Sequence, residues 1–167
     1  MVHKVLENIL GEKYTMNKIL DFFQISIGFS WKGLVIFLLP MFPNFLFLII
    51  NNPSNEMVIT NNNLLINMIE HGSQGLFAVL LIFFISKKEA PILSRYMIFI
   101  SLFLLSYFLL WLLYFTVGAN FEILMLMAII PVIYFIIAEV WLHNLLAVAV
   151  TVVFGITHVT ITYLNYH

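Results

Sequence analysis

The stretch Leu64–Ile85, LLINMIEHGSQGLFAVLLIFFI, decides the fold of this chain. As a helix rising about 1.5 Å per residue, it is long enough to cross a lipid bilayer. Its first half nevertheless contains Glu70, His71, Ser73 and Gln74. Ionisable side chains at such a depth are costly and usually have a partner. The stretch therefore predicts a transmembrane helix that carries a polar site.

The composition places the whole chain among membrane proteins. Of its 167 residues, 63% are hydrophobic and 9% are charged, and the mean hydropathy is +1.06. Soluble domains carry about 25% charged residues, and a chain this short cannot bury so much apolar surface in its own core. The net charge of −1 gives no basis for nucleic-acid binding. The absence of cysteine excludes disulfides and thiolate chemistry.

Apolar stretches separated by polar breaks predict an all-α integral membrane protein with five transmembrane helices in one bundle. The predicted spans are 33–50, 64–86, 96–117, 121–142 and 145–165. The last two come from one apolar run that is about twice as long as one crossing needs, so it must fold back at the polar break Trp141–Asn144. One bundle domain at 33–167 results.

Residues 1–32 form a separate, more charged segment. Their apolar positions recur at helical spacing between lysines, which predicts short amphipathic helices on the membrane surface. Of the seven Lys and Arg residues, four precede the first span and three lie between the second and third. Because positive residues stay on the inner side, the N-terminus is predicted in the cytoplasm and the C-terminus outside. We expect a multi-pass protein of a bacterial cytoplasmic membrane.

Two polar stripes run along predicted helices. One, on the second span, comprises Asn63, Asn67, Glu70 and Gln74. The other, which we call the seam, runs along the fifth span and comprises Asn144, Ala147, Thr151, Gly155, His158, Thr162 and Asn165. Small residues let helices approach closely, and polar residues bond across the contact. The seam therefore predicts helix packing, with His158 as its one ionisable member.

Four spans carry polar or amphipathic side chains to a similar depth, about 9–10 Å below the outer surface. The predicted ligand-binding residues around that layer are Asn44, Glu70, His71, Gln74, Trp111, Glu122 and His158. Glu70 would share a proton with His158 or His71, since a nearby imidazole lowers the cost of a buried carboxylate. Alternatively, Glu70 forms a structural lock with the fifth span, or lies at the interface if the second span begins near Gly72. No spacing concentrates metal ligands, and we predict no metal and no cofactor.

At the inner end, Glu139 is predicted to form a charge pair with the basic loop between the second and third spans. Aromatic residues near predicted span ends are expected to anchor the bundle at the membrane surface. These are Trp31, Trp141, Tyr163 and Tyr166.

Three functions fit these observations. The first is binding or transport of a small ligand or ion through a polar cavity in the outer half, between the first, second and fifth spans. The second is a non-catalytic membrane partner or immunity-type protein, whose seam packs helices or docks another chain or a second copy. The third is a membrane enzyme acting on a lipophilic substrate, with Glu70 and His158 as acid and base. The lack of a nucleophile motif or phosphate loop favours a non-enzymatic role.

Three short strings resemble those of small bacterial multi-span membrane proteins of unassigned function. They are Trp31-Lys32-Gly33-Leu34, Leu39-Pro40-Met41-Phe42-Pro43-Asn44 and Gly155-Ile156-Thr157-His158. The resemblance covers most of the chain from Trp31 onward. It implies a compact bundle in the lipid bilayer and carries no activity.

Overall fold

The structure is a bundle of helices with one short pair of strands, seen in a computed structural model that describes residues 18, 21, 24–50 and 64–167. The helices are α2 (Trp31–Ile50), α3 (Leu64–Phe83), α4 (Arg95–Val117), α5 (Phe121–Trp141) and α6 (Leu145–Tyr166). The strands are β1 (Ile25–Ile27) and β2 (Phe84–Ser86). Each helix begins and ends within three residues of a predicted span.

Four of these helices are long and apolar enough to cross a membrane: α3, α4, α5 and α6. Within α2, the fully described apolar stretch is Trp31–Phe47, which is shorter than these four helices. The predicted helical, membrane-compatible class is therefore confirmed for four helices. A fifth crossing by α2 stays a prediction.

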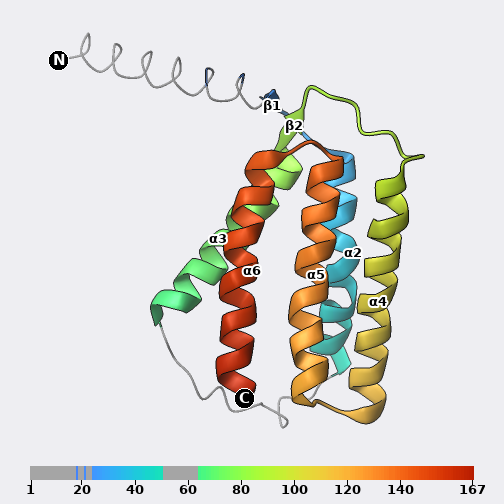
Figure 1. Ribbon diagram of the computed structural model, residues 1–167, viewed down its shortest axis with the longest axis vertical. Coiled ribbons are helices and arrows are strands. Elements are labelled where there is room, and N and C mark those ends of the chain that lie inside the picture. The colour runs from blue at the N-terminus through green and yellow to red at the C-terminus, as the bar shows by residue number, and fades with distance from the viewer. Residues whose placement is uncertain (1–17, 19–20, 22–23, 51–63) are drawn as a thin grey trace, which may run out of the picture.

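The helices stand side by side, with α5 between α4 and α6, α2 behind α5, and α3 slanting across α6 (Figure 1). Aromatic side chains fill the centre between α3, α5 and α6: the ring of Phe77 lies 5.0 Å from that of Phe135 and 5.2 Å from that of Phe154. The buried hydroxyl of Tyr134 donates a hydrogen bond to the Ile36 carbonyl at 3.0 Å. That bond ties α5 to α2 inside the core.

Two glycines permit close approach of helix backbones. A side chain at Gly33, at the start of α2, would clash with the carbonyl oxygen of Leu81 near the end of α3. A Cβ at Gly155 in α6 would lie 2.5 Å from Cγ1 of Val132 in α5. Both glycines are buried. Their positions explain how α2 packs on α3 and α6 on α5.

The strand pair was not predicted. Residues Ile25–Ile27 run antiparallel to Phe84–Ser86, with Ile25 opposite Ser86. This pairing ends α3 at Phe83, three residues before the predicted end of the second span. Nor was β1 expected in a segment that we assigned to amphipathic helices. Apart from residues 18, 21 and 24–32, that segment lies outside the described residues, so its amphipathic helices stay a prediction.

Asparagine side chains begin the last two helices. The Asn120 side chain accepts a hydrogen bond from the Ile123 amide at 2.8 Å, and Asn144 accepts one from the Ala147 amide at 3.1 Å. Both bonds satisfy amides that the first turn of a helix leaves unpaired. The turn between α5 and α6 lies at 142–144, inside the polar break that the sequence indicates.

Candidate functional site

Glu70 and His158 meet across the contact between α3 and α6. The Nδ1 atom of His158 lies 2.5 Å from Oε1 of Glu70, within hydrogen-bonding distance. The two residues are 88 positions apart in the chain. They come together because α3 and α6 run alongside each other, with Glu70 near the start of α3 and His158 in the second half of α6.

The surroundings of the pair enclose the carboxylate more than the imidazole. The Glu70 side chain is 12% exposed and that of His158 is 32% exposed. One face of the His158 ring stacks on Phe154, with ring centroids 5.1 Å apart. The pair is therefore fixed on the inner side and accessible from the imidazole side.

A second polar cluster lies between α2 and α4. The side-chain amide of Asn44 donates to the Pro40 carbonyl at 3.1 Å and to the Tyr107 hydroxyl at 3.4 Å. The Tyr107 ring packs edge-on against Trp111, and Phe47 packs on the same indole. The Asn44 side chain thus bonds back to a carbonyl one turn earlier in its own helix, beside the two prolines of α2.

The remaining predicted site residues stand apart from both clusters. His71 and Glu122 are exposed, and Gln74 is half-buried. In the part of the chain that the structure describes, no hydrogen bond joins any of them to Glu70 or His158. The predicted layer thus contains two separate clusters. A solvent-open cavity at the pair stays a prediction, since 51–63, which precede α3, lie outside the described residues.

The seam packs as predicted. Asn144, Ala147, Thr151 and Gly155 are buried, and His158, Thr162 and Asn165 are half-buried. Gly155 lies against Val132 of α5, while His158 contacts α3. The seam therefore serves contacts within this chain.

The prediction for Glu139 is wrong. Its side chain is fully buried, and Oε1 accepts a hydrogen bond of 2.6 Å from the Thr151 hydroxyl in α6. Oε2 is buried without a hydrogen-bond partner among the described residues. Each helical residue turns about 100° from the last, so Glu139 faces α6 while Trp141, two residues on, faces the basic loop.

Trp141 is also placed differently from the expected surface anchor. It is buried, and its indole Nε1 donates to the Pro91 carbonyl at 2.9 Å. Asn144 follows three residues later in the chain, and its side-chain amide donates to the carbonyls of Leu80 and Phe84 at 2.8 and 2.9 Å. Sequence reasoning missed this buried polar cluster, although polar residues on both sides of one tight turn were its visible signal.

Potential metal ligands do not cluster among the described residues. Within the described ranges, no three His, Asp or Glu side chains gather closely enough to hold an ion. At the pair itself, one carboxylate faces one imidazole.

No protein-family model matches this chain, and neither a curated protein nor a solved structure is significantly similar to it. The resemblance of its short strings to small bacterial membrane proteins stays a prediction.

Proposed function

We propose that this chain is a multi-pass membrane protein that binds a small cation at Glu70, with His158 as the competing partner of the same carboxylate. The observation that carries the proposal is the 2.5 Å contact between Glu70 Oε1 and His158 Nδ1. Ionisable residues inside membrane helices commonly mark ion or proton pathways. The pair joins two helices, so a ligand that separates the two groups would also change the contact between α3 and α6.

The His158 imidazole and a cation would compete for the Glu70 carboxylate. The carboxylate can accept a hydrogen bond from the imidazole N–H, or it can hold a cation in its place. The imidazole is the more exposed partner, so a ligand reaches the carboxylate from that side. Binding therefore requires the imidazole to move away from Oε1, and ligand release restores the pair.

A structural lock is the second candidate function of the pair. The stacking of His158 on Phe154 favours it, because a stacked ring is held in one orientation. In that case Glu70 and His158 would only join α3 to α6. The lock and the cation site differ in one measurable respect, which is whether stability depends on the cation present.

We also infer that α2 crosses the membrane, which gives five spans with the N-terminus inside. The strand pair holds the start of α2 at the end of the bundle where α3 finishes. From there α2 extends along the bundle for 20 residues, about the thickness of a bilayer core. Exposed leucines at helical spacing on α4 would face lipid, namely Leu102, Leu105, Leu109 and Leu112.

The test is a thermal-shift measurement on detergent-solubilised protein with Na⁺, K⁺ and tetramethylammonium chloride at constant ionic strength. We expect one of these cations to raise the melting temperature of the wild type, because a ligand that binds only the folded state stabilises it. Glu70→Gln removes the charge and should abolish that cation-specific rise. Glu89→Gln makes the same change at an exposed carboxylate outside the site and should leave the rise intact.

If no cation distinguished itself in the wild type, or if Glu70→Gln kept the full rise, the cation site would be wrong. A loss of stability in Glu70→Gln that was equal in all three salts would support the lock instead.

A further inference from the structure

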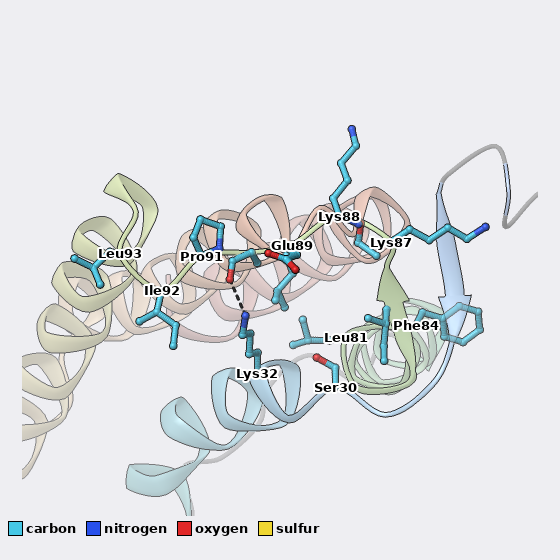
Figure 2. Close-up of a pocket in the computed structure, with 14 residues that line it drawn as sticks. Ser30, Lys32, Leu81, Phe84, Lys87, Lys88, Glu89, Pro91, Ile92 and Leu93 are labelled. Atoms are coloured by element: carbon cyan, nitrogen blue, oxygen red, sulfur yellow. Dashed lines mark hydrogen bonds between the residues drawn. The ribbon is translucent and has the colours of Figure 1, made fainter.

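A pocket of 720 Å³ lies at the end of the bundle where β1, β2 and the start of α2 meet. Its walls include Ser30 and Lys32 from the start of α2, Leu81 and Phe84 from the end of α3, and the loop 87–93 (Figure 2). This volume is within the range of sites for small molecules. The pocket is remote from the Glu70–His158 pair, since Leu81 is near the opposite end of α3 from Glu70.

The loop that covers the pocket is held by specific hydrogen bonds. The Lys32 ammonium donates to the Ala90 carbonyl at 2.7 Å, and Trp141 donates to the next carbonyl, that of Pro91, at 2.9 Å. The Lys87 amide donates to the Gln24 carbonyl at 2.8 Å, which extends the strand pairing into the loop. The pocket is therefore a built feature of the fold.

The pocket lining carries a net positive charge, because Lys32, Lys87 and Lys88 outnumber its one carboxylate residue, Glu89. Figure 2 shows Lys32 reaching from α2 toward the loop, while Lys88 extends from the rim on the far side of the loop, away from Lys32. Among the described residues, neither ammonium has a carboxylate within ion-pair distance, whereas Lys87 pairs with Asp21 at 2.8 Å. An ammonium has three donors, so Lys32 keeps donors for a ligand beyond its bond to Ala90.

The same loop presents apolar side chains beside this charge. Ile92 is 65% exposed and Leu93 is 99% exposed. Both also line a neighbouring groove of 650 Å³, which continues along α4 past Met97 and Ile98. The groove is mostly apolar and also contains Ser94, Arg95 and Ser101. A positively charged pocket beside such a groove matches a molecule with an anionic head and a hydrocarbon tail.

We propose that this pocket binds the phosphate headgroup of an anionic phospholipid, with Lys32 on the phosphate, Lys88 attracting it from the rim, and an acyl chain along the groove beside α4. Basic pockets between membrane helices are suited to anionic headgroups, and each lysine near such a surface contributes about 1 kcal/mol. The lipid source follows from the groove, because inorganic phosphate would use the lysines alone. This site is independent of the cation proposed at Glu70.

The experiment is native mass spectrometry of the full chain in detergent, titrated with phosphatidylglycerol or with phosphatidylcholine of the same acyl chains. We expect one phosphatidylglycerol to bind more tightly than phosphatidylcholine. Lys32→Gln and Lys88→Gln should each weaken phosphatidylglycerol binding about fivefold, and the double variant about thirtyfold. Lys18→Gln removes an equal charge from an exposed lysine outside the pocket and should have little effect.

Three results would overturn the proposal. They are equal affinity for the two lipids, equal weakening by Lys18→Gln and Lys88→Gln, and binding of glycerol 3-phosphate as tightly as phosphatidylglycerol. Because Lys32 also holds the loop, Lys32→Gln can lower stability. Lys88→Gln has no such contact, so its fivefold loss decides the question if the Lys32 variant does not fold.

Discussion

At the residue scale, the two carboxyl groups inside the bundle have different partners. Glu70 faces an imidazole that can exchange protons, and its site is accessible from the His158 side. Glu139 is fully buried, and among the described residues its one hydrogen-bond partner is the hydroxyl of Thr151. A buried polar group without a hydrogen-bond partner is costly, so both carboxyl groups depend on the helix opposite. Glu70 is suited to binding, whereas Glu139 is suited to holding α5 against α6.

Thr151→Val tests the role assigned to Glu139. The substitution keeps the shape of the side chain and removes the only hydrogen bond that the buried carboxyl group receives among the described residues. We expect it to lower the free energy of unfolding by about 1–3 kcal/mol, measured by denaturant titration in micelles.

Thr160→Val is the matched control, because Thr160 is exposed and its hydroxyl bonds back to Ile156 of its own helix. We expect the control to change stability by less than about 0.5 kcal/mol. Equal effects of the two substitutions would contradict a structural role for the Glu139–Thr151 bond.

The shared depth of polar side chains on the predicted spans identified part of the polar site. Counting residues from the span ends places Glu70 and His158 at one level, and the structure joins them. The same count placed Asn44 and Trp111 at that level, yet they pack with Tyr107 between α2 and α4. Depth is one coordinate only. Which side of the bundle a helix occupies depends on packing that a single sequence does not reveal.

At the element scale, small residues decide how α6 sits on α5. The steps of three and four along the seam predicted one packed face, and its first four members are buried. The short strand β1 had no comparable signal, because three residues are too few to show a period. Glu139 was predicted to face the basic loop, whereas it faces α6. Which way it points depends on which face of α5 packs inward, and α5 has no polar stripe that marks this face.

Gly155→Ala tests the close approach of α5 and α6. An added methyl group would lie 2.5 Å from Val132 Cγ1, so we expect a loss of about 1–3 kcal/mol from overpacking. Gly75→Ala makes the same change in α3, where nothing lies within 4 Å, and should be neutral or stabilising because alanine favours helix.

Val132→Ala should restore part of the stability of Gly155→Ala, since it removes the atoms that the methyl group would meet. Unfolding measurements in micelles provide all three comparisons. Indistinguishable effects of Gly155→Ala and Gly75→Ala would show that the two helices do not touch as described.

At the scale of the whole molecule, the basic residues Lys32, Lys87, Lys88 and Arg95 and the Glu70–His158 pair lie at opposite ends of the bundle. The strand pair, the basic loop and the proposed lipid pocket lie where α3 ends, while Glu70 lies near its start. The apolar composition and the lysine distribution predicted this polarity. Neither could predict the pocket, because its walls come from α2, α3 and the loop together.

The number of crossings has a direct test. With α2 as a fifth span, reporters fused at the N-terminus and after His167 lie on opposite sides of the membrane. With four spans they lie on the same side. We expect activity of a cytoplasmic reporter only at the N-terminus, and of an external reporter only at the C-terminus. Activity of the same reporter at both ends would exclude the five-span arrangement.

His158→Ala tests whether His158 and a cation compete for the Glu70 carboxylate. The substitution removes the imidazole that occupies the carboxylate and leaves Glu70 free. In the same thermal-shift assay, we expect the stabilising cation to bind His158→Ala about tenfold more tightly than the wild type, since a charge-assisted hydrogen bond contributes about 1.5 kcal/mol or more. Unchanged or weaker cation binding by the His158→Ala protein would show that His158 does not compete with the cation.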